Sequence, residues 1–148
     1  MKNIFFSNRI LSTDTASLIL RIIFGGLLLF NHGVGKLAML QQDDVQFVNF
    51  LGLGVHASAW LTAFAEFLCA AFVLVGLFTR VAIIPIVINM LTAILMAHVG
   101  QPFAKSEMAL LYAGAFITIF LLGPGKYSAD AQMFKKMPES NFKRHAIA

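Results

Sequence analysis

Residues 16–40 read ASLILRIIFGGLLLFNHGVGKLAML, and this stretch decides the fold. It is long and apolar enough to cross a bilayer, which takes about 20 mainly apolar residues. Four side chains that avoid lipid nevertheless lie in it: Arg21, Asn31, His32 and Lys36. At about 100° per residue, Arg21, His32 and Lys36 share one helix face, and the opposite face is Leu, Ile and Phe. We therefore predict a membrane-spanning helix with a polar seam that faces protein or water.

The composition indicates an integral membrane protein. Of the 148 residues, 59% are hydrophobic and 12% are charged, whereas about a quarter of a typical soluble domain is charged. The single cysteine, Cys69, excludes an internal disulfide, a CxxC dithiol and a CxxCH haem attachment. The net charge of +4 comes from basic residues at predicted helix ends. Membrane topology accounts for them there, so we expect no nucleic-acid partner.

Four apolar segments predict four spans, at residues 16–38, 57–79, 81–99 and 106–122. The predicted fold is all-α: a single integral membrane four-helix bundle over residues 1–148, with a basic tail at 126–148. A tight turn is expected at Thr79 and Arg80, between the second and third spans. Asp43 or Asp44 is expected to cap a short interfacial helix that ends at Gly52.

The basic residues are distributed unevenly between the two sides of these spans. An even number of spans places both termini on one side, together with Arg80 and most other Lys and Arg residues. Only Lys36 and Lys105 fall on the opposite side. Because cytoplasmic loops carry an excess of Lys and Arg, both termini are expected to be cytoplasmic.

Ionisable residues within the predicted spans indicate a polar pocket that faces outward. Glu66 lies nine residues into the second span, and ionisable residues inside a membrane are functional candidates by default. In this functional interpretation a cavity for a polar or redox-active head group is lined by His32, Lys36, Glu66, His98 and Glu107, and Tyr112 is a candidate hydrogen-bond donor to a quinone. In the structural interpretation, Glu66 pairs with Arg21 or Lys36 and only joins the helices. Both interpretations stay open.

Four residues within the predicted spans also have simpler interpretations. His32 and His98 could ligate a metal or haem iron, but two isolated histidines lack ligand spacing, so we expect no metal site. Asn89 is expected to bridge two helices. Cys69 is expected to be a small, inert residue of the core.

The chain also resembles the DoxX family. Four motifs carry this resemblance in order: LILRIIFGGLLLFNHGVGKL at 18–37, AEFLCAAFVLVGLFTR at 65–80, EMALLY at 107–112 and GPGKYSAD at 123–130. The resemblance implies a small four-helix protein of the bacterial inner (plasma) membrane. The family's motif positions are occupied here by Arg21, His32, Gly33, Lys36, Glu66, Arg80, Glu107, Gly123, Gly125, Ser128 and Asp130.

The resemblance implies two kinds of function. Some DoxX relatives are linked to thiosulfate:quinone oxidoreduction or a terminal quinol oxidase, and others to a membrane complex that handles oxidative and thiol stress. Distant eukaryotic relatives are cargo receptors or assembly factors. We therefore expect a membrane subunit of a redox or detoxification system that binds a quinone or a similar molecule. The alternative is a non-catalytic scaffold for a partner membrane or periplasmic protein, and a homo-oligomer is compatible with both.

Each site residue has an expected role in the redox hypothesis. Glu66 is the candidate catalytic residue, as a proton-accepting or substrate-orienting carboxylate. His32 and Lys36 are expected to donate hydrogen bonds to a carbonyl or anionic oxygen, and Arg21 to keep Glu66 ionised. Quinone is the favoured cofactor, and haem or a metal is less favoured.

Overall fold

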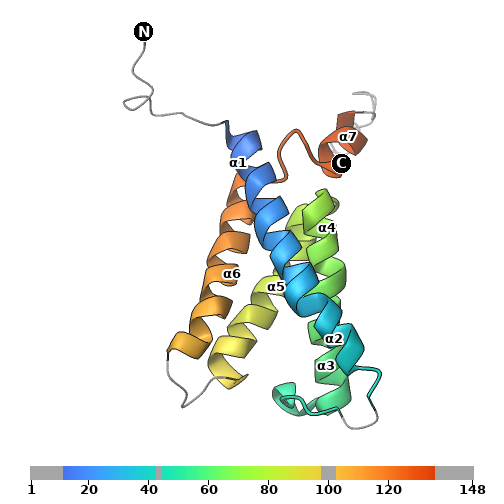
Figure 1. The fold of residues 1–148 in the computed structure, drawn as a ribbon. Coiled ribbons are helices and arrows are strands. Elements are labelled where there is room, and N and C mark those ends of the chain that lie inside the picture. The colour runs from blue at the N-terminus through green and yellow to red at the C-terminus, as the bar shows by residue number, and fades with distance from the viewer. Residues whose placement is uncertain (1–11, 43–44, 98–102, 136–148) are drawn as a thin grey trace, which may run out of the picture.

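The computed structural model describes residues 12–42, 45–97 and 103–135, and the regular structure within these ranges is helical (Figure 1). The first helix comprises α1 (Thr13–Leu20), η2 (Arg21–Gly25), η3 (Leu28–Gly33) and α2 (Val34–Met39). The second comprises α3 (Val55–Ala63), η5 (Phe64–Cys69) and α4 (Ala70–Val75). The third comprises α5 (Thr79–Thr92) and η6 (Ala93–Ala97), and the fourth is α6 (Ala104–Leu122). A short helix, α7 (Ala129–Lys135), follows.

The helices have the length and composition of membrane spans. Three are long and apolar enough to cross a bilayer: Thr13–Met39, Val55–Val75 and Thr79–Met96. The fourth is apolar but shorter by the same measure, Ser106–Leu122. Large apolar side chains such as Phe30, Trp60 and Leu121 point outward, where lipid would cover them. The prediction of an all-helical membrane protein is therefore confirmed for the described residues.

The turn between the second and third helices lies earlier than predicted. The second helix ends at Gly76, whose φ of +80° stops it. Thr79 and Arg80 are the first residues of α5 rather than the predicted turn. The carboxylate of Asp130 explains this start, because it accepts hydrogen bonds from the backbone N–H groups of Phe78 (2.7 Å) and Thr79 (3.0 Å). A cap supplied from about 50 residues away cannot be found by reading the local sequence.

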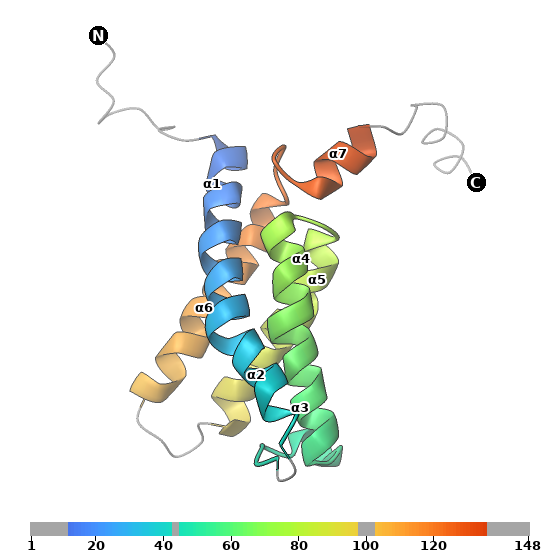
Figure 2. The same ribbon diagram turned by 45° about the vertical axis from the view of Figure 1, so that its right-hand side comes forward.

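The first and second helices lie side by side (Figure 2), and two glycines of the first helix are in close contact with the second. A Cβ at Gly33 would lie 2.5 Å from the carbonyl oxygen of Glu66, and one at Gly25 would lie 3.3 Å from the backbone nitrogen of Leu74. Small residues allow helices in membranes to approach closely. The core of the bundle forms around these contacts and includes Leu28, Cys69, Ile86, Tyr112 and Phe116.

The segment between the first and second helices does not form the predicted interfacial helix. Residues 45–49 have no regular structure, and only η4 (Phe50–Gly52) is a single 3₁₀ turn. The expected caps, Asp43 and Asp44, lie outside the described residues. Val45 is nonetheless buried, and the Phe50 N–H donates a 2.9 Å hydrogen bond to Ser58 Oγ on α3. The segment therefore packs against the bundle as a loop.

The two ends of the bundle differ. α1 and α7 are at the same end of the bundle, where the four helices are close to one another (Figures 1 and 2). Toward the opposite end, the pair α5 and α6 diverges from α2 and α3 in both views. We call these the terminal end and the loop end. The divergence creates the space that the candidate site occupies.

Candidate functional site

A cavity of about 560 Å³ lies between the diverging helices near the loop end. Pockets of about 300–1,000 Å³ are typical of small-molecule sites. The first and second helices contribute most of the polar lining, and α5 and α6 form the other wall. The polar or ionisable side chains in the lining are His32, Lys36, Ser58, Thr62, Glu66, Asn89, Thr92 and Tyr112.

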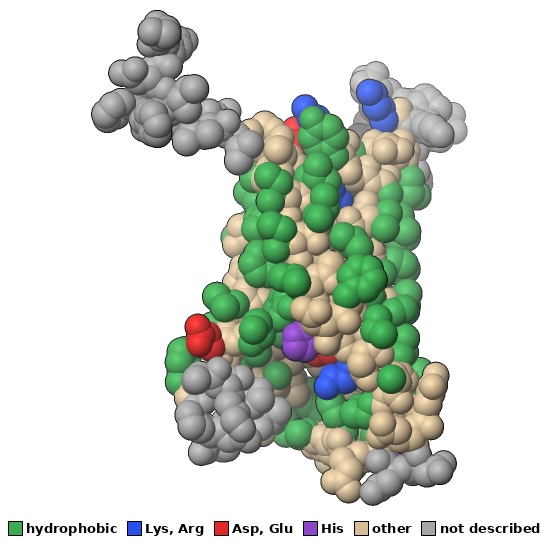
Figure 3. Space-filling view, viewed as in Figure 1, with side chains coloured by type: hydrophobic (Ala, Val, Ile, Leu, Met, Phe, Trp, Pro, Cys, Tyr) green, Lys and Arg blue, Asp and Glu red, His purple; other side chains and the backbone are tan. Residues whose placement is uncertain are grey.

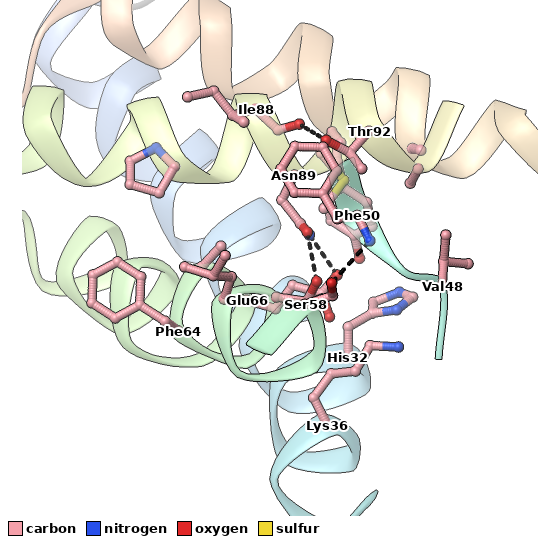
Figure 4. Close-up of a pocket in the computed structure, with 18 of the residues that line it drawn as sticks. His32, Lys36, Val48, Phe50, Ser58, Phe64, Glu66, Ile88, Asn89 and Thr92 are labelled. Atoms are coloured by element: carbon pink, nitrogen blue, oxygen red, sulfur yellow. Dashed lines mark hydrogen bonds between the residues drawn. The ribbon is translucent and has the colours of Figure 1, made fainter. Parts of the chain in front are cut away.

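Glu66 is the central charged group of this cavity (Figure 4). It lies in the π-helical segment η5, and such segments often occur at functional sites. Its side chain is 7% exposed. Asn89 Nδ2 donates a 2.9 Å hydrogen bond to Glu66 Oε1, and Asn89 Oδ1 accepts a 3.0 Å bond from Thr62 Oγ1. Glu66 Oε2 is buried, and none of the described residues gives it a hydrogen-bond partner.

Two basic side chains of the first helix face this carboxylate. Lys36 and His32 both interact electrostatically with Glu66, although no ion pair within 4.0 Å joins them in the described part of the chain. The Lys36 ammonium lies 5.1 Å from the ring centre of Phe47. Because Lys36 and His32 are near Glu66 without an ion pair, a ligand hydroxyl could accept hydrogen bonds from them and donate one to the carboxylate.

Tyr112 closes the cavity on the side of α6. Its ring packs edge-on against His32, with the ring centres 5.5 Å apart, and against Phe24, at 6.2 Å. The side chain is 5% exposed. These contacts fix the positions of the His32 and Tyr112 rings relative to each other. Four of the sequence-predicted site residues, His32, Lys36, Glu66 and Tyr112, are thus brought together.

Arg21 lies elsewhere, and its expected role beside Glu66 is corrected. Its side chain is fully buried near the terminal end, where Nη2 donates a 3.2 Å hydrogen bond to the carbonyl of Tyr127. A Cβ at Gly76 would overlap the guanidinium group. Arg21 and Gly33 are twelve residues apart on the first helix, or about 18 Å at 1.5 Å per residue, and it is Gly33 that contacts Glu66.

The physical reason for this correction is helix register. The expectation treated the first two spans as similar in length and aligned at their ends. The first helix has 27 residues and the second has 21, and their relative height is set by the contact of Gly33 with Glu66. Arg21 therefore meets the end of α4 and the segment before α7, where Asp130 interacts with it electrostatically.

Two other predicted site residues are not part of the cavity lining. Glu107 is exposed in the first turn of α6 and does not line the cavity. His98 lies outside the described residues. Among the residues that are described, no group of three His, Cys, Asp or Glu side chains is placed to hold a metal ion. Cys69 is buried with a free thiol in the hydrophobic core.

Several lining residues were not predicted as site residues. Asn89 was expected to bridge helices, which its bonds to Thr62 and Glu66 confirm, and it is also part of the cavity wall. Its polarity within an apolar span was the available signal. The loop residues Phe47, Val48 and Phe50 also line the cavity, but nothing in their local sequence indicates that the loop folds onto the bundle.

The chain is similar to known proteins over most of its length. The family model DoxX matches residues 16–99, which include His32, Lys36 and Glu66. An uncharacterized membrane protein of Mycobacterium tuberculosis is 29% identical over 132 residues, which cover 75% of this chain and 77% of the relative. No solved structure matches the chain.

Proposed function

Because this chain belongs to the DoxX family, a family of membrane proteins, we propose that it binds a quinone or a similar small redox-active molecule within a redox or detoxification system. One observation carries the proposal. Glu66 Oε2 is a buried carboxylate oxygen with no hydrogen-bond partner in the part of the chain that the structure describes, and Glu66 lines a cavity of small-molecule size. An unpaired buried acceptor is costly, and a ligand hydroxyl would satisfy it.

The surrounding residues have complementary roles in this proposal. Lys36 and His32 donate to a carbonyl or anionic oxygen of the ligand, and Tyr112 orients the imidazole of His32. Asn89 occupies Glu66 Oε1 and so directs the other oxygen toward the ligand. Glu66 accepts a proton from a bound hydroquinone or orients the hydroquinone. In this proposal the cavity binds both the quinone and its reduced form.

The same proposal has consequences for location and partners. The protein lies in a bacterial inner membrane with the terminal end in the cytoplasm, because the basic residues are concentrated there. The cavity near the loop end then lies closer to the outer face. In this proposal, electrons arrive from, or leave to, a partner membrane or periplasmic redox protein.

Ligand analysis of the purified protein tests this proposal. We would purify the protein in a mild, quinone-free detergent, record its absorption spectrum and extract it for mass spectrometry. The wild type and Glu107→Gln are expected to retain a quinone, and Glu66→Gln is expected to lose at least nine-tenths of it. Glu107→Gln is the matched control, because it makes the same chemical change at an exposed residue outside the cavity.

The outcomes separate the two functional hypotheses. Equal quinone content in Glu66→Gln and wild type would contradict the role of Glu66. A ligand-free wild type that does not bind added benzoquinones would contradict the redox proposal as a whole. If such a protein instead retained a stoichiometric partner protein, the scaffold alternative would be favoured, and Glu66→Gln would then lower stability without a chemical defect.

A further inference from the structure

The ionisable residues and some of the large apolar residues of the lining lie in different parts of the cavity (Figure 4). In the close-up, His32 and Lys36 lie on one side, Phe64 and Ile88 on the opposite side, and Glu66 and Asn89 between them. In the space-filling view, a histidine, a basic and an acidic side chain surround a hollow in the surface of the protein (Figure 3). The cavity therefore has two basic side chains on the first helix and large apolar side chains, Leu61, Phe64 and Ile88, on the second helix and α5.

These three apolar side chains face both the cavity and the exterior. Leu61, Phe64 and Ile88 all line the cavity, yet they are 51%, 47% and 52% exposed. Leu61 and Phe64 are on the second helix, and Ile88 is on α5. In a membrane protein this exterior surface meets acyl chains. These three side chains, which we call the apolar rim, hence border an opening toward lipid.

Loop residues cover part of the cavity at its loop end. Phe47, Val48 and Phe50 line the cavity there. The contacts that hold this loop include a 2.9 Å hydrogen bond from the Phe50 N–H to Ser58 Oγ and the position of the Lys36 ammonium over the Phe47 ring. The three side chains of the apolar rim, in contrast, are each about half exposed.

From this arrangement we propose, resting on the function proposed above, that the ligand is a lipid-dissolved amphiphile that enters through the apolar rim. Its head group lies at Glu66, Lys36 and His32, and its hydrocarbon tail leaves between Leu61, Phe64 and Ile88. A volume of about 560 Å³ accommodates a substituted ring, whereas a long polyprenyl tail extends into the bilayer. The substrate class is thus a tailed quinone or quinol rather than a water-soluble one.

Photo-crosslinking in nanodiscs tests the path of the tail. The probe is a dimethoxy-methyl-benzoquinone with a decyl tail that ends in a diazirine, and the competitor is the same ring without a tail. Crosslinks that the competitor removes are expected on peptides that cover residues 57–68 and 81–92. Crosslinks on residues 45–50, or on residues 104–112 of α6, would overturn the proposed path.

Blocking variants provide an independent readout. Leu61→Trp and Ile88→Trp place larger side chains at the apolar rim and narrow its opening. Both are expected to reduce competable crosslinking by the tailed probe at least tenfold. Leu68→Trp and Leu91→Trp are matched controls, because both residues are exposed on the same helices but do not line the cavity. The tail-free ring should bind all four variants within threefold of wild type, as measured by calorimetry.

The two proposals fail in different ways. If the tail-free ring does not bind wild type, or binds Glu66→Gln equally well, the proposed function fails. If the ring binds in a Glu66-dependent manner but Leu61→Trp and Ile88→Trp behave like their controls, the proposed function stands and the entry path is overturned.

Discussion

Asn89 Nδ2 donates a 2.9 Å hydrogen bond to Glu66 Oε1 and thereby ties the third helix to the second at the wall of the cavity. The amide is itself oriented, because its Oδ1 accepts a 3.0 Å bond from Thr62 Oγ1. Thr62, Asn89 and Glu66 thus form a series of hydrogen-bonded side chains that ends at Oε2, for which the described residues supply no partner. In this arrangement the carboxylate is held by one oxygen and presents the other.

We predict that Asn89→Ala weakens both the bundle and the site. Hydrogen bonds between helices in membranes contribute about 0.6–1.7 kcal/mol, and loss of the amide also releases Glu66. Thr62→Val is the control, because it removes the orienting hydroxyl but keeps the bond to Glu66. Unfolding in SDS–detergent mixtures should show the larger loss for Asn89→Ala. An unchanged unfolding midpoint and unchanged quinone binding in Asn89→Ala would show that the hydrogen bonds of Asn89 matter neither for stability nor for the site.

Gly33→Ala is predicted to separate the first two helices at the site. Its Cβ would lie 2.5 Å from the carbonyl oxygen of Glu66 and 2.9 Å from the Cα of Phe67. Both are backbone atoms that cannot move aside, so we expect a loss of about 1–3 kcal/mol. Gly35→Ala, with open space around the new methyl group, should behave like wild type. Equal thermal stability of the two variants in nanodiscs would contradict this close contact.

Gly76→Ala should be among the most damaging single changes at the terminal end. Gly76 has a φ of +80°, and its Cβ would overlap the Arg21 guanidinium and lie 2.6 Å from Ser128 Cβ. Gly52 has a similar φ of +76° with open space around it. Gly52→Ala therefore measures backbone strain alone, about 1–2 kcal/mol. We expect size-exclusion chromatography to show a greater loss of folded protein for Gly76→Ala than for Gly52→Ala. Equal losses would contradict the close packing of Gly76 against Arg21.

Asp130→Ala is predicted to release α7 and destabilise the start of α5. The carboxylate accepts bonds from the Phe78 and Thr79 N–H groups and from Thr79 Oγ1 at 2.9 Å. Loss of a cap at a helix N-terminus costs about 0.5–2 kcal/mol. Asp130→Asn keeps one acceptor oxygen and should fall between Ala and wild type, whereas Gln132→Ala, an exposed change on α7, should be neutral. Limited proteolysis near α7 would reveal the release, and resistance equal to wild type would exclude it.

The sequence alone was sufficient to recognise the four apolar helices and the polar seam of the first one. It also identified Glu66, His32 and Lys36 as candidates for one site, and the cavity brings these residues together. The helix ends were less accurate, because the Asp130 cap on α5 comes from a distant segment. The loop over the cavity was predicted as a helix, because its apolar spacing satisfies a helix pattern, whereas its contacts are with Ser58 and Lys36.

Apolar length and charge content determined that this chain is a helical membrane protein, because transfer into lipid depends on the local sequence of each segment. Which polar residues meet was decided only by the tertiary structure. The contact of Gly33 with the backbone of Glu66 sets the height of the first helix against the second, and it places Arg21 beside Gly76 instead of Glu66. Such register depends on the fit between side chains of different helices, and no periodicity within one helix contains that information.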